Sequence, residues 1–75
     1  MNSNEIDIGN LILQKLKEEN LSVAWLAEKV DKEPSYFRKM LKKRSIDTNL
    51  LLSISKILNY NFFQYYQVNF YPKIG

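Results

Sequence analysis

The residues best suited to chemistry in this 75-residue chain are cations. The run from Arg38 to Arg44 carries five positive charges in seven positions, and Phe37, Met40 and Leu41 stand beside or among them. Positive side chains on a surface can bind polyanions, including the phosphates of nucleic acids. At 100° per residue the three apolar residues fall on one side of a helix. The opposite side would then hold the cations outward at a fixed distance and angle.

Other chemistries find little support. The chain has no cysteine and no histidine, which excludes disulfides and the usual zinc sites. Catalysis would rest on Asp, Glu, Lys, Ser or Tyr alone, and no spacing suggests such a site. We therefore expect no enzyme activity, no metal and no cofactor. The net charge of +3 and the pI of about 9.2 are compatible with a polyanionic partner without proving one.

The elements that must position the cations are helices. Apolar residues recur at i, i+3 and i+4 almost throughout, which predicts an all-α domain of five short helices without strands. Ser22 and Asp47 are the expected caps of the second and fourth helices. Pro34 favours the first position of the third helix, and Ile46 and Leu51 stand where a hydrophobic staple would place them. The helices are expected at about residues 6–20, 23–30, 34–43, 48–59 and 62–66.

A short helix, a three-residue turn and a basic helix match the helix-turn-helix arrangement, whose second helix enters the DNA major groove. Residues in the first half of that helix read base edges, and residues near its end contact phosphates. On its own, an amphipathic basic helix is more often simply solvated than bound to nucleic acid. The candidate base contacts are Pro34, Ser35, Tyr36, Arg38 and Lys39, and the candidate phosphate contacts are Lys42, Lys43 and Arg44.

The segment LSVAWLAEKVDKEPSYFRKMLKKRSIDTNLLLSISKILNYNFFQYY, residues 21–66, resembles the Cro/repressor (XRE) family of bacterial and phage DNA-binding domains. The L-A-E-K segment and the element lengths carry the resemblance. The chain departs from the family at the turn, where Asp31 replaces the usual Gly, Lys32 an apolar residue and Glu33 a Ser or Thr cap. Val23 replaces a Gln that often touches phosphate. Glu33 could lie at the helix N-terminus or accept from a cytosine amino group.

The resemblance implies a lambda-repressor-like helix-turn-helix bundle. It implies base-edge roles for the positions of Pro34, Ser35, Tyr36 and Lys39, whereas Arg38 is added from the helical wheel. The N-terminal amides of the second helix, around Ser22 and Val23, would hold a phosphate. In the family the terminal helix often contributes to dimer contacts.

Aromatic residues crowd the tail of the chain, residues 60–75. Several can close the core, but a domain this small can hardly bury them all, so some should form a partner surface. Trp25 lies off the apolar face of its helix. It either folds over the first helix or the N-terminal arm, or serves as a partner contact. The candidate dimer or partner surface comprises Phe62, Phe63, Tyr65, Tyr66 and Trp25.

Together these observations predict one domain over residues 1–75, with the helix-turn-helix pair at about 22–43. We expect a cytoplasmic transcriptional regulator that binds double-stranded DNA as a homodimer and is nucleoid-associated when bound. The polar N-terminus and the lack of a long apolar run favour a protein without membrane contact. The alternative is a helix-turn-helix-shaped protein-interaction module without DNA binding. Replacing Arg38 and Lys39 with Ala separates the two, because only the regulator would lose DNA affinity.

Overall fold

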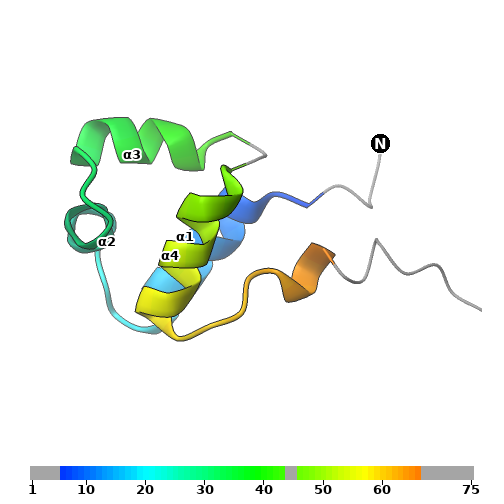
Figure 1. Cartoon of the computed structure of the whole chain (residues 1–75). Coiled ribbons are helices and arrows are strands. Elements are labelled where there is room, and N and C mark those ends of the chain that lie inside the picture. The colour runs from blue at the N-terminus through cyan, green and yellow to red at the C-terminus, as the bar shows by residue number, and fades with distance from the viewer. Residues whose placement is uncertain (1–5, 44–45, 67–75) are drawn as a thin grey trace, which may run out of the picture.

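The computed structural model describes residues 6–43 and 46–66, and within those ranges the chain is helical without strands. The helices are α1 (Ile8–Glu18), α2 (Val23–Lys29), α3 (Pro34–Leu41) and α4 (Thr48–Leu58). Figure 1 shows α4 in front of α1, with α2 seen end-on and α3 running lengthwise across one end. Residues 64–66 are helical again after a turn at 62–63, so the fifth helix begins two residues later than predicted. The all-α class is confirmed.

Each of the four helices begins with a side chain that accepts a hydrogen bond from the backbone N–H three residues on. Ser22 and Asp47 do this for α2 and α4, as predicted, with distances of 3.0 Å to the Trp25 nitrogen and 3.1 Å to the Leu50 nitrogen. Asp7 and Glu33 cap α1 and α3 in the same way. These bonds satisfy donors that a helix leaves unpaired at its start, so they fix where each helix begins.

Three helices end on a residue with left-handed backbone. Asn20, Asp31 and Asn59 have φ values of 60°, 61° and 52°. In each case the next residue donates its N–H to the carbonyl five positions back, as Lys32 does to Ala27 at 2.8 Å. This pattern is a common helix terminator, and Asn and Asp tolerate it better than other non-glycine residues. Asp31 thus adopts left-handed backbone at the position where the resembled family usually has Gly.

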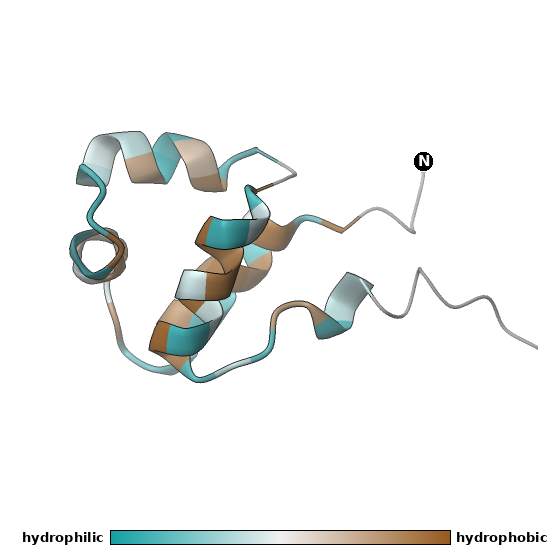
Figure 2. Ribbon diagram, viewed as in Figure 1, coloured by the Kyte–Doolittle hydropathy of each residue, from teal (hydrophilic) through white to brown (hydrophobic). Residues whose placement is uncertain are grey.

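The core is formed by apolar residues from all four helices and the segment after α4. The sequence patterning is visible in Figure 2, where hydrophobic positions recur among hydrophilic ones along each helix. Ile46 and Leu51 lie where the staple was predicted, Leu51 buried and Ile46 half-buried. Among the described residues, no buried side-chain nitrogen or oxygen lacks a hydrogen-bond partner. The fully or almost fully buried residues are Ile8, Ile12, Leu16, Leu26, Ala27, Phe37, Leu41, Leu51, Ile54 and Phe62.

The first turn of α1 lies directly against the end of α3. A Cβ built on Gly9 would overlap the carbonyl oxygen of Leu41 and lie 2.6 Å from its carbonyl carbon. Because real Cβ atoms do not approach backbone this closely, only glycine allows the two helices to meet here. This contact sets the position of α3 relative to α1.

The helix ends differ from prediction by one or two residues, as is usual for frayed ends. α1 occupies residues 8–18 rather than 6–20, α3 ends at Leu41 rather than Lys43, and α4 ends at Leu58 rather than Asn59. In the part of the chain that the structure describes, no helix is both long and apolar enough to cross a bilayer.

Candidate nucleic-acid interface

The outward face of α3 carries the candidate base and phosphate contacts. Ser35, Tyr36, Arg38 and Lys39 are exposed, as are Lys42 and Lys43 just beyond the helix. Pro34 is half-buried and lies less far outward. Within residues 6–43 and 46–66, the ion pairs that form involve only Lys15, so the two cations on α3 and the two just beyond it form no ion pair within the described chain. The structure thus gathers, on α3 and just after it, a positive face that no carboxylate of residues 6–43 and 46–66 pairs with.

The inward face of α3 holds this surface in place. Phe37 is fully buried, Leu41 is almost fully buried, and Met40 packs partly against the core. α3 contacts both α2 and α1. The wheel-based expectation of one packed and one charged face is therefore confirmed, and the cations project from a helix that cannot turn without exposing Phe37 and Leu41.

The turn before α3 is acidic, and its carboxylates have distinct positions. Glu33 caps α3, its Oε1 accepting from the Tyr36 nitrogen at 2.9 Å. Of the two roles considered for Glu33, the structure places it at the helix N-terminus, where negative charge is stabilised. Glu28 and Asp31 line the same hollow of about 510 Å³ as Lys32, Glu33 and Pro34, so its charged lining is net negative. Phosphates are therefore disfavoured around Pro34 and favoured toward the other end of α3.

The start of α2 was predicted to hold a phosphate through Ser22 and Val23. The Ser22 hydroxyl is engaged within the helix, because it accepts from the Trp25 nitrogen, while Val23 is half-buried. Phosphate binding by the backbone amides at this site stays a prediction.

The segment after α4 divides between core and surface. The prediction that Phe62 belongs to an exposed partner surface is wrong, because Phe62 is fully buried and its backbone nitrogen donates to the Ser55 hydroxyl at 3.4 Å. Phe63 and Tyr65 are half-buried and Tyr66 is exposed. Phe63 and Tyr66 line an apolar hollow of about 400 Å³ together with residues from the start of α4. Its other lining residues are Ile46, Thr48 and Leu51.

Trp25 packs partly against the core, and the Lys29 ammonium lies 5.6 Å from its ring centroid. The ring is therefore not freely exposed. Its assignment to a partner surface stays a prediction.

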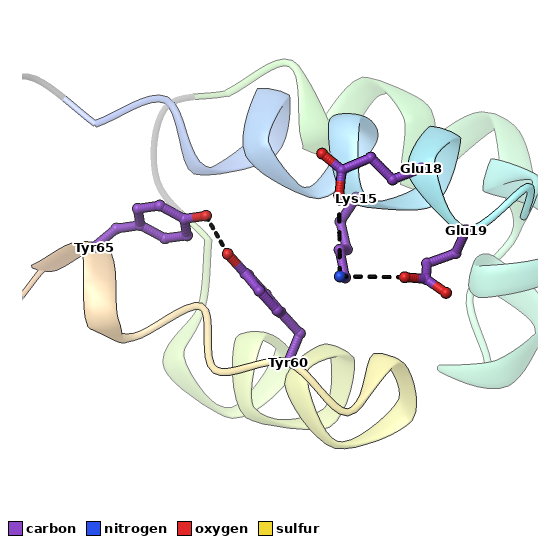
Figure 3. A network of polar contacts seen from close by, with 5 residues as sticks. All are labelled: Lys15, Glu18, Glu19, Tyr60 and Tyr65. Atoms are coloured by element: carbon purple, nitrogen blue, oxygen red, sulfur yellow. Dashed lines mark hydrogen bonds and ion pairs between the residues drawn. The ribbon is translucent and has the colours of Figure 1, made fainter.

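A network that the sequence did not reveal joins α1 to the segment after α4 (Figure 3). The Lys15 ammonium lies 4.4 Å from the Tyr60 ring centroid and 3.2 Å from a Glu19 carboxylate oxygen. Tyr60 and Tyr65 share a hydrogen bond of 2.5 Å between their hydroxyls. These contacts fasten the C-terminal aromatic residues to α1. Lys15 and Tyr60 are 45 positions apart, and no local pattern in the sequence links such distant residues.

The tyrosine pair predicts a pH dependence of stability. The hydrogen bond with Tyr60 raises the pKa of Tyr65 above its ordinary value of 10.0, and the burial of Tyr65 raises it further. Because the folded state holds this proton more tightly, the stabilisation is complete below pH 10 and is lost as the pH rises through the folded-state pKa. We expect Tyr65→Phe to cost about 0.5 to 1 kcal/mol at pH 7. We also expect it to flatten the fall in stability between pH 9 and 11.

Urea unfolding followed by circular dichroism at several pH values measures both effects. Tyr36→Phe, which removes a hydroxyl from the exposed face of α3, is the matched control and should leave the wild-type profile unchanged. A Tyr65→Phe profile parallel to wild type above pH 9 would contradict the stabilising role of the pair.

Of the predictions above, the phosphate contact at Arg44 and the part of the aromatic tail from residue 67 onward lie outside the described residues. Within the described ranges, no three Asp or Glu side chains converge in a way that would hold a metal ion. No protein-family model, curated protein or solved structure matches this chain.

Proposed function

We propose that this chain is a lambda-repressor-like helix-turn-helix protein that binds double-stranded DNA sequence-specifically and regulates transcription. The observation that carries the proposal is the positive face of α3, whose cations form no ion pair within the described residues and are held outward by the burial of Phe37 and Leu41. An α-helix is about 10–12 Å wide with its side chains, which fits a major groove of about 12 Å. α3 would enter that groove, with α2 crossing the DNA backbone behind it.

The positions along α3 favour a division of roles. Ser35, Tyr36, Arg38 and Lys39 are exposed on α3, and we assign base edges to them. Lys42 and Lys43 follow at the end of α3, where cations suit phosphates. The acidic turn at the other end supports this direction, because its carboxylates would repel a phosphate strand placed there.

We also propose that the protein acts as a homodimer. The support is the apolar hollow at the start of α4, lined by Phe63 and Tyr66, together with Leu52, whose side chain is 43% exposed on α4. Apolar surface of this kind is often covered by a partner. A two-fold dimer would present two α3 helices about 34 Å apart, or one turn of DNA.

Selection from a randomised duplex pool at moderate salt, followed by sequencing of the retained DNA, tests both proposals. An inverted repeat with half-site centres about 10 bp apart is the expected result. A single enriched half-site would support DNA reading and contradict the dimer. Recovery of nothing above background would contradict the regulator and direct attention to the hollow beside Tyr66 as a protein-binding surface.

A further inference from the structure

Tyr36 is the most exposed large apolar side chain among the described residues, with 57% of its surface accessible. Single exposed apolar residues are common, so its significance lies in its position. It stands three residues before Lys39 on α3, which makes the two side chains neighbours on the helix surface. Its backbone is fixed, because its N–H donates to the Glu33 carboxylate at 2.9 Å. The ring therefore projects from a defined point on the positive face.

The other apolar candidate on this face is less suited to contact DNA. Pro34 is half-buried and lines the hollow that also holds Glu28, Asp31 and Glu33. Three carboxylates and the Lys32 ammonium line the hollow at Pro34, whereas Tyr36 is exposed with Lys39 beside it. Apolar contact with DNA is therefore expected at Tyr36.

Resting on the proposed function, we propose that Tyr36 reads the C5-methyl group of a thymine in the major groove. That methyl is the apolar group that the four standard bases display there. The three-residue step from Tyr36 to Lys39 rises about 4.5 Å along the helix, which is between one and two base-pair steps of about 3.4 Å. The thymine would thus lie within about two base pairs of the one that Lys39 contacts.

The test uses the duplex enriched from the randomised pool, resynthesised with each thymine in turn replaced by uracil, which lacks only the methyl. We expect one position in each half-site where uracil weakens binding about three- to fivefold, equivalent to about 0.8 kcal/mol for one buried methyl. Tyr36→Phe should keep this dependence, because the ring remains. Tyr36→Ser should bind the thymine and uracil duplexes equally.

Leu13→Ser is the matched control, since it removes an exposed apolar side chain from α1 rather than α3, and it should retain the uracil effect. Equal binding of every uracil duplex by the wild type, an enriched site without thymine, or a uracil effect that persists in Tyr36→Ser would overturn the role of Tyr36 and leave the DNA-binding proposal standing. Failure to enrich any duplex would overturn both.

Discussion

Gly9→Ala should destabilise the protein by at least about 3 kcal/mol, enough to unfold much of a small domain. Alanine is favoured over glycine inside a helix by about 1 kcal/mol, so helix propensity alone predicts stabilisation. The contact with Leu41 turns this expected stabilisation into a destabilisation. The added Cβ would overlap the Leu41 carbonyl oxygen, and a backbone atom cannot rotate away as a flexible side chain can. Relief would require α3 to move away from α1 and expose part of the core around Phe37.

Urea unfolding followed by Trp25 fluorescence and far-UV circular dichroism measures the change in free energy. Gln14→Ala is the matched control, because Gln14 is exposed on the same helix, and its replacement should change stability by less than about 0.5 kcal/mol. A Gly9→Ala protein as stable as wild type would mean that α1 and α3 do not pack this closely.

Much of the helical framework could be predicted because its determinants are local. Ser22 and Asp47 cap the helices expected of them, and Pro34 begins α3. Placing residues at 100° each around a helix correctly predicted that Phe37 and Leu41 are buried and that the cations are exposed. It did so because the period of an α-helix decides which side chains share a face. Glu33 fits the same logic, since the carboxylate before Pro34 is close enough to cap the helix that follows.

What could not be predicted depends on contacts between distant parts of the chain. Gly9 gives no local sign that it must face the carbonyl of Leu41, and a glycine in the first turn of a helix has several explanations. The placement of Lys15 over Tyr60 depends on how the chain returns after α4. Phe62 was assigned to a partner surface because composition cannot decide which member of an aromatic cluster closes the core.

The candidate site combines both kinds of information. The sequence shows that cations and apolar residues alternate on α3, which sets the two faces. The structure adds that the cations have no carboxylate partner in the described chain, that Glu33 is engaged as a cap, and that Tyr36 projects more fully than Pro34. These facts make the two ends of α3 differ in charge. Its first turn borders an acidic hollow, and its remaining length is positive, so a polyanion would approach it from the side of Lys39 and Lys43.

Replacing Arg38 and Lys39 together with Ala should weaken binding to the enriched duplex by about 100-fold. Each side chain lost from a base edge costs about 1 to 3 kcal/mol, and tenfold in affinity corresponds to 1.4 kcal/mol. Both side chains are exposed on α3, so the double variant should remain folded. Fluorescence anisotropy with a labelled duplex at several salt concentrations measures the loss, and sedimentation measures self-association, which should not change.

The matched control replaces Lys17 and Lys56 with Ala, which removes the same charge from exposed positions on α1 and α4. Because long-range attraction is screened beyond about 10 Å at 0.1 M salt, this control should lose far less affinity than the α3 variant. Lys42→Ala separates the two kinds of contact. A phosphate contact should lower the salt slope by about one and weaken all sequences alike, whereas loss of Lys39 should relax the choice of base at one position. Equal losses in the α3 variant and the Lys17 and Lys56 control would mean that net charge, rather than the face of α3, holds the DNA.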